Sequence, residues 1–145
     1  MNDKRLSWEQ YALHLARVAA LRSPDPYKKV GACALNSKNR VIGVAYNGLI
    51  SNFEPPLNFW DNRDERRKYV VHAEANLLSL FKRNKCKLLA CTLLPCSACA
   101  TLIASHGVKK VVYNEVYTRD TSALDIFKFY GIELKQVEYD DVQEI

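Results

Sequence analysis

The sequence predicts one α/β domain over residues 1–145, with three layers (α/β/α) built around a central five-stranded mixed sheet. Three observations support this fold class. A length of 145 residues suits a single core, apolar runs of strand length alternate with segments of helical periodicity, and the elements follow the order αββαβαβαβ. Hydrophobic residues make up 48% of the chain and no apolar run approaches the roughly 20 residues that span a bilayer, so no membrane partner is expected.

The first half of the chain predicts a helix, a hairpin and a long loop. Ser7 and Gln10 form a capping-box pattern ahead of apolar positions at helical spacing, which predicts a helix over residues 8–21 that stops before Pro24. Apolar runs at 30–35 and 40–46 flank a polar turn, as in a β-hairpin. Residues 47–69 contain Pro55-Pro56 and little periodicity, so we expect a loop, and loops of this length are usually functional.

The second half predicts three further helices alternating with three strands. The expected helices cover residues 72–83, 96–106 and 121–130, and the expected strands cover 87–92, 110–113 and 132–137. Pro95 stands before the second of these helices, while Gly107 and Gly131 stand where helices end in a left-handed residue.

Two short motifs contain the residues of a zinc site. His72-Ala73-Glu74 is followed, 22 residues after Glu74, by Pro95-Cys96-Ser97-Ala98-Cys99. One imidazole and two thiolates, from His72, Cys96 and Cys99, suit zinc and leave one tetrahedral position open for water. Two cysteines spaced i, i+3 share a face of the first helical turn, where the helix N-terminus favours thiolate. Glu74 is the predicted catalytic residue, a proton carrier that does not bind the metal itself.

A closed, structural zinc site is the alternative, and Cys91 is the residue that could complete it as a fourth ligand. Otherwise Cys33, Cys86 and Cys91 are expected to be small buried hydrophobic residues. The N-terminal residues show no signal-peptide pattern, so we expect a cytoplasmic protein with reduced cysteines.

The net charge of +5 suits an anionic partner, which could be a nucleotide phosphate as readily as a nucleic acid. Residues 61–68 form the densest charged stretch, but its signs alternate. A solvated loop is therefore the favoured interpretation and a phosphate-binding track the minor one.

The pattern H-x-E followed by P-C-x-x-C is typical of zinc-dependent deaminases. The chain resembles the cytidine deaminase superfamily, and within it the deoxycytidylate (dCMP) deaminases, at residues 45–48 (A-Y-N-G for the family's G-Y-N-G), 72–76 (H-A-E-A-N) and 92–96 (T-L-L-P-C). The resemblance implies a cytidine deaminase-like fold and hydrolytic deamination of dCMP to dUMP and ammonia, with Glu74 moving the protons. Some members hold a second zinc, but no Cys or His lies between Gly48 and Val71, so we expect one zinc per subunit.

The resemblance also implies substrate contacts. Asn47 would hydrogen-bond the sugar or base, and backbone groups at Ala73 and near Cys96 would hold the pyrimidine edge. Arg22 and Ser23 would face the 5′-phosphate, although a solvated position at a helix C-terminus is an alternative for Arg22. Tyr117 and Arg119 resemble residues that close over substrate, and here Thr118 separates them.

Regulation is a further implication, because many dCMP deaminases are hexamers activated by dCTP and inhibited by dTTP. The second nucleotide site would lie near Tyr46, Gly48 and Leu49, with Mg²⁺ accompanying the regulatory triphosphate. Three rival functions stay open: a tRNA adenosine deaminase, which would need a basic RNA-binding face that the alternating charges do not support, a deaminase of free cytidine, and a catalytically silent nucleotide-binding regulator.

Overall fold

The structure is a computed structural model that describes residues 4–142. Its core is a five-stranded sheet with the strand order β2-β1-β3-β4-β5. The strands are β1 (Gly31–Leu35), β2 (Val41–Tyr46), β3 (Leu88–Leu93), β4 (Lys110–Glu115) and β5 (Glu133–Gln136). β1 runs antiparallel to β2 and β3, whereas β3, β4 and β5 are parallel to one another. The predicted mixed sheet is confirmed.

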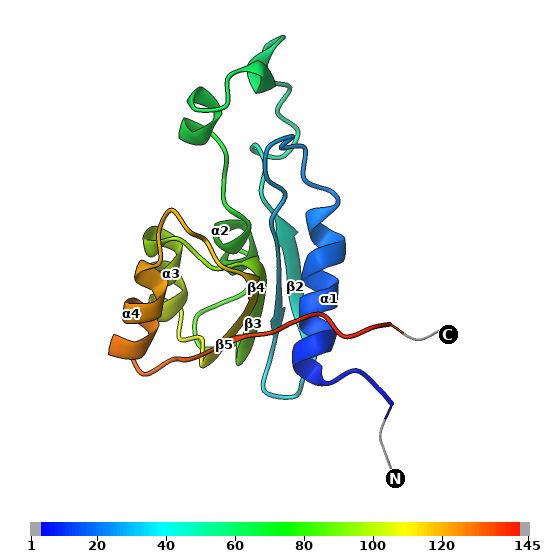
Figure 1. Ribbon diagram of the computed structural model, residues 1–145, viewed down its shortest axis with the longest axis vertical. Coiled ribbons are helices and arrows are strands. Elements are labelled where there is room, and N and C mark those ends of the chain that lie inside the picture. The colour runs from blue at the N-terminus through cyan, green and yellow to red at the C-terminus, as the bar shows by residue number, and fades with distance from the viewer. Residues whose placement is uncertain (1–3, 143–145) are drawn as a thin grey trace.

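Helices cover both faces of this sheet (Figure 1). They are α1 (Trp8–Ala20), α2 (Ala73–Leu78), α3 (Ser97–Ser105) and α4 (Ser122–Phe129). α1 packs on one face, and α2, α3 and α4 pack on the other, which confirms the three predicted layers. Among residues 4–142, no helix combines the length and the apolar character needed to cross a membrane.

The side chains of β1 show how the layers are held. Cys33 and Leu35 pack in the cluster that includes α1, while Ala32 and Ala34 pack in the cluster on the opposite face. All five residues of the strand are buried, because β1 lies inside the sheet and has helices on both faces. Gly31 permits the closest approach, since a Cβ at this position would lie 1.8 Å from the carbonyl oxygen of Ala16.

The start of α1 differs from the expected capping box in one bond. The Ser7 side chain caps the helix by accepting a hydrogen bond from the Gln10 amide, as predicted. The Gln10 side chain does not reach back, however, and donates to the carbonyl of Glu138 instead. It thereby ties the segment after β5 to α1.

Two regions differ from the expected elements. α2 ends at Leu78 and does not continue to residue 83, because Phe81 and Asn84 bond to His106 at the end of α3. The expected loop contains two short 3₁₀ helices, η1 (Phe59–Asp61) and η2 (Glu65–Lys68). They lie in residues 49–70, here called the arm, which projects from the body at the end of the sheet (Figure 1).

Candidate metal centre

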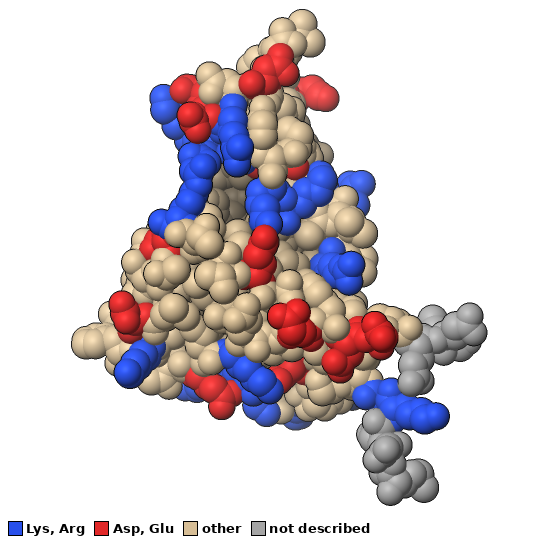
Figure 2. All heavy atoms as spheres, viewed as in Figure 1, with Lys and Arg blue, Asp and Glu red and all other residues tan. Residues whose placement is uncertain are grey.

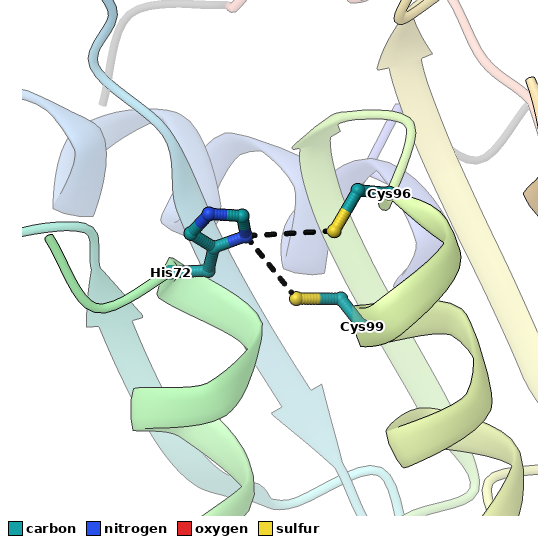
Figure 3. Close-up of side chains that lie close together, drawn as sticks. All are labelled: His72, Cys96 and Cys99. Atoms are coloured by element: carbon teal, nitrogen blue, oxygen red, sulfur yellow. Dashed lines mark hydrogen bonds between the residues drawn. The ribbon is translucent and has the colours of Figure 1, made fainter. Parts of the chain in front are cut away.

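His72, Cys96 and Cys99 meet where two helices begin. His72 is the N-cap residue of α2 and Cys96 is the N-cap residue of α3, both with extended backbone. Cys99 follows within the first turn of α3, so that its sulfur points to the same place as that of Cys96 (Figure 3). The three side chains that the sequence predicts as ligands are therefore brought together by two converging helix N-termini.

The distances between these side chains fit a single zinc ion. The Nδ1 atom of His72 lies 3.3 Å from the Cys99 sulfur and 3.6 Å from the Cys96 sulfur (Figure 3). Zn–N and Zn–S bonds of about 2.05 and 2.3 Å at a tetrahedral angle place such a nitrogen and sulfur about 3.6 Å apart. All three potential ligand atoms lie within 4.8 Å of one another. The geometry and the ligand chemistry both suit zinc.

The hydrogen bonds within the cluster favour a thiolate at Cys96 and a protonated thiol at Cys99. Hydrogen bonds from the Cys99 thiol and the His72 ring lower the pKa of Cys96 to about 4. The same bond to Cys96, together with burial, raises the pKa of Cys99. The bond to Cys96 also raises the pKa of His72. A cation at this point would replace the shared protons as the stabilising charge.

The remaining cysteines lie in the core. Cys33 and Cys91 are fully buried, Cys86 is 2% exposed, and burial raises the pKa of all three thiols. Cys91 packs among apolar side chains of β1, α2 and α3 and is not part of the His/Cys cluster, which among the described residues has three members. A zinc ion held by these three side chains would keep one tetrahedral position open, as a catalytic zinc site requires.

A cavity of about 370 Å³ opens beside this cluster, and Glu74 forms part of its lining together with His72 and Cys96. Glu74 lies in the first turn of α2 and is 4% exposed. Burial raises the pKa of its carboxyl group. A buried carboxyl next to a metal site and facing a cavity is well placed to exchange protons with a bound molecule.

The cavity is also rich in positive charge. Figure 2 shows Lys and Arg side chains on both sides of the hollow beneath the arm. The lining contains five cationic Lys and Arg side chains and three carboxylates, and the formal charges of these eight side chains add up to +2. The cations are Lys28, Arg63, Arg66, Arg67 and Arg119, and the carboxylates are Asp25, Glu74 and Glu115. Such a cavity suits an anionic ligand.

Four of the predicted substrate-binding residues line this cavity: Asn47, Ala73, Tyr117 and Arg119. The amide of Asn47 is held by the backbone, since its Oδ1 accepts from the Val30 amide at 2.9 Å and its Nδ2 donates to the Lys28 carbonyl at 2.9 Å. Asn47 therefore fixes the cavity wall, and one N–H of its amide is left for a ligand.

Arg22 and Ser23 lie outside the lining. The Arg22 side chain is exposed just beyond α1, and the buried Ser23 hydroxyl donates to the Asn47 carbonyl at 2.8 Å. The structure thus does not bring these two residues to the cavity, and Ser23 acts on it indirectly, by donating to the Asn47 carbonyl and by accepting from the Asp25 amide at 3.2 Å.

Asp120 connects the loop of Tyr117 and Arg119 to the metal centre. Its Oδ2 atom accepts a hydrogen bond from the Ser97 amide at 2.8 Å, and its Oδ1 atom accepts one from Ser122 at 3.0 Å. These bonds hold the pKa of the Asp120 carboxyl well below its usual range. The loop after β4 is therefore fastened to the first turn of α3.

Tyr46, Gly48 and Leu49, expected to form a regulatory site, lie at the end of β2 and outside the cavity lining. The Tyr46 carbonyl accepts from the Asn76 side chain at 3.0 Å, and Gly48 forms a bridge with Val71. This segment therefore contacts the residues on either side of His72.

The charged side chains that come from the arm and from residues 25–28 line the cavity but were not among the predicted site residues. A wholly solvated loop over residues 61–68 is wrong, because Arg66 is buried and pairs with Asp25. The available signal was the position of three arginines, Arg63, Arg66 and Arg67, shortly before the His72 motif.

Comparisons with known proteins agree with this geometry. The profile of the family described as "Cytidine and deoxycytidylate deaminase zinc-binding region" matches residues 6–115. The deoxycytidylate deaminase of Mus musculus is 33% identical over 147 residues, which cover 92% of this chain and 82% of the mouse protein. The crystal structure of the dCMP deaminase from cyanophage S-TIM5 in apo form has a TM-score of 0.72, with 26% identity over 89% of this chain and 96% of the phage chain. Its complex with dCMP and dUMP has a TM-score of 0.67, with 26% identity over 90% and 93% of the two chains.

Proposed function

Because the chain belongs to the cytidine and deoxycytidylate deaminase family, we propose that it catalyses the hydrolytic deamination of dCMP to dUMP and ammonia. One observation carries this proposal: the cluster of His72, Cys96 and Cys99 stands beside the buried Glu74 at a cavity with a net charge of +2. The cluster and the carboxylate match the chemistry of the reaction, and the charge matches a nucleotide monophosphate.

Zinc is the cofactor that suits this site, with one ion per subunit held by His72, Cys96 and Cys99. When bound there, zinc supplies an acidified water close to neutral pH at its fourth position. A catalytic site of this kind differs from a structural one by that open position, and Cys91 does not fill it.

Glu74 moves the protons. It accepts one proton from the attacking water and delivers it to N3 of the pyrimidine, then accepts the proton of the new hydroxyl group on C4 and delivers it to the amine, which leaves as ammonia. The water contributes its oxygen to C4, so dCMP and water yield dUMP and ammonia and the carboxylate is restored. The burial of Glu74 excludes bulk water, which would otherwise compete for these transfers.

Four cavity residues position the substrate in this proposal. The backbone at Ala73 holds the pyrimidine edge, Asn47 meets the sugar or base with its remaining N–H, and Tyr117 and Arg119 close over the nucleotide from the loop after β4. The position of Ser23 supports an indirect role, through the Asn47 carbonyl, and Arg22 is left as a solvated residue.

The proposal also includes regulation by nucleotides. We place a nucleotide site for dCTP and dTTP, with Mg²⁺ accompanying the triphosphate, at Tyr46, Gly48 and Leu49, in a homohexamer. The bridge from Gly48 to Val71 and the bond from Asn76 to Tyr46 support it, since they connect this segment to both sides of His72. We further propose that residues 1–145 form a single deaminase domain that works in the cytoplasm.

Ammonia release separates this proposal from its rivals. Purified protein of known zinc content is given dCMP, dCTP, deoxycytidine or an adenosine-containing tRNA stem-loop, each with and without added dCTP and dTTP. Turnover of dCMP that rises with dCTP and falls with dTTP is the expected result. Turnover of the RNA alone would assign a tRNA adenosine deaminase, preference for deoxycytidine would assign a nucleoside deaminase, and zinc-loaded protein inactive on every substrate would be a regulator.

A further inference from the structure

The arm is fastened to the body by a charged side chain. Across residues 49–70, Arg66 is the one buried side chain, at 6% exposure. Loops are ordinarily fixed by apolar residues, because a buried guanidinium must recover the hydrogen bonds it loses to water. The contacts of Arg66 therefore decide where the arm stands.

Those contacts surround the guanidinium. Its Nε donates to Oδ1 of Asp25 at 3.1 Å, and the two side chains are 7% and 3% exposed. Its Nη1 donates to the carbonyl of Arg63 at 2.9 Å, within the same segment. Its carbon Cζ lies 4.6 Å from the centre of the Tyr27 ring. Arg66 thus joins the arm to residues 25–27 and also shapes the arm itself.

Asp25 organises the opposite side of this contact. The Oδ1 atom that pairs with Arg66 also accepts hydrogen bonds from the amides of Tyr27 at 2.8 Å and Lys28 at 3.3 Å. The Tyr27 hydroxyl donates to the Trp60 carbonyl at 2.5 Å, which adds a second tie to the arm. Residues 25–28 and the arm form one unit on the cavity wall.

Within the arm, the charges that remain available at this wall are those of Arg63 and Arg67. Arg66 is neutralised by the buried Asp25, and Lys28, which lies outside the arm, pairs with Glu115 in an exposed and therefore weak ion pair. Arg63 stacks over the Tyr27 ring at 5.6 Å, and the Arg67 ion pair with Asp64, at 3.4 Å, is exposed and therefore weak. Both arginines line the cavity that contains Glu74.

A buried ion pair stabilises a fold poorly, because desolvation offsets the attraction between the charges. It does, however, fix one geometry, since both partners lose their hydrogen bonds if they separate. In this position the fixed geometry determines where Arg63 and Arg67 meet the cavity. Guanidinium groups bind phosphate oxygens through paired, charge-assisted hydrogen bonds, so their placement sets phosphate recognition.

We propose that Arg63 and Arg67 select the 5′-phosphate of the substrate, and that the buried Asp25–Arg66 pair is the positioning device that holds them at the cavity. This inference rests on the proposed function, because it assigns a nucleotide monophosphate to the same site. It identifies the arm as the element that separates nucleotides from nucleosides.

Calorimetric binding of dUMP and deoxyuridine to the zinc-loaded protein tests the two arginines, because the ligands differ only in the phosphate. We expect Arg63→Gln and Arg67→Gln to weaken the binding of dUMP at least tenfold and to change the affinity for deoxyuridine less than twofold. Arg83→Gln, an exposed arginine outside the lining, is the matched control and leaves both affinities as they are. Unchanged dUMP affinity in both variants, or a wild type that binds dUMP no tighter than deoxyuridine, overturns the proposal.

The positioning role needs its own variants. Arg66→Lys keeps the charge opposite Asp25 but loses the bond to the Arg63 carbonyl, and Asp25→Asn removes the charge of the pair. We expect the preference for dUMP over deoxyuridine to fall at least threefold in Arg66→Lys and further in Asp25→Asn. If Arg66→Lys lowers the affinities for dUMP and deoxyuridine by the same factor, the role of Arg66 is merely structural and the proposal is contradicted. If Asp25→Asn fails to fold, Arg66→Lys carries the test alone.

Measurements of turnover distinguish failure of this inference from failure of the proposed function. Protein that deaminates dCMP while the arginine variants keep the wild-type preference for dCMP over deoxycytidine retains its function and refutes the inference. Protein that binds dUMP in the expected, arginine-dependent manner without deaminating dCMP supports the inference and refutes the function.

Discussion

Replacing Glu74 by glutamine is expected to abolish turnover while the fold and the zinc remain in place. Glutamine has nearly the same volume, so the change leaves no hole at a side chain that is 4% exposed. It also leaves the His72, Cys96 and Cys99 side chains untouched. The variant therefore isolates the proton transfers from the metal.

The size of the loss in turnover follows because no other carboxylate that lines the cavity is free to take over the proton transfers. Of the other two carboxylates there, Asp25 pairs with Arg66 and Glu115 pairs with Lys28. General acid–base catalysis typically contributes about 10² to 10⁴ in rate. Since Glu74 serves two successive transfers in our proposal, we expect kcat to fall by about 10³ or more, which corresponds to a barrier about 4 kcal/mol higher.

The assay combines three measurements on one preparation: conversion of cytosine to uracil followed by absorbance, zinc per chain by mass spectrometry, and the thermal midpoint. Glu54→Gln, at an exposed glutamate of the arm, is the control for the loss of one carboxylate. Activity of Glu74→Gln within tenfold of the parent, with zinc bound, would refute the assignment of Glu74 as the proton carrier.

Two further predictions concern the fold that supports the site. Gly31→Ala should lower the free energy of unfolding by about 1–3 kcal/mol or more, because the added Cβ would lie 1.8 Å from the Ala16 carbonyl oxygen and α1 must move away from β1. Urea denaturation measures this loss, and an unchanged midpoint would contradict the close packing. Asp120 should stabilise the native state at neutral pH, because its bonds from Ser97 and Ser122 lower its pKa in the folded chain relative to about 3.9 in the unfolded chain. This contribution is complete above the unfolded pKa and is lost as the pH falls through the folded pKa, so the stability difference between wild type and Asp120→Asn, both stripped of metal, should shrink below about pH 4; a difference that is constant from pH 3 to pH 7 would exclude this role.

The metal cluster could be predicted from the sequence because its signals are local. Cys96 and Cys99 share one helical turn, and Pro95 and Gly107 mark the limits of the helix that contains them. The alternation of strands and helices then places the start of that helix near His72, since β3 and β4 are parallel.

The arm could not be predicted, because its decisive contact is distant in sequence. Arg66 bonds to a carboxylate 41 residues earlier in the chain, at Asp25. Alternating charges such as those of residues 61–68 are typical of solvated surface. The three arginines before the His72 motif indicate a basic segment, but nothing local distinguishes the one among them that is buried.

The early end of α2 has the same kind of cause. Periodicity continues through Leu80 and Phe81, but the Phe81 carbonyl accepts a bond from the His106 ring at 2.9 Å, and Asn84 adopts a left-handed conformation. Tertiary contacts with α3 thus override local helix propensity.

Zinc content measured together with dCMP turnover tests whether His72, Cys96 and Cys99 form the catalytic metal site. The protein is loaded with zinc, titrated with a chelator, and reloaded, with ammonia release from dCMP followed at each step. We expect one zinc per chain, activity that falls in proportion to the zinc removed, and recovery on reloading. A Cys99→Ala variant should bind little zinc and show no turnover. Full deamination by zinc-free protein, or stable binding of zinc by the variant, would contradict the assignment of His72, Cys96 and Cys99 as the catalytic metal site.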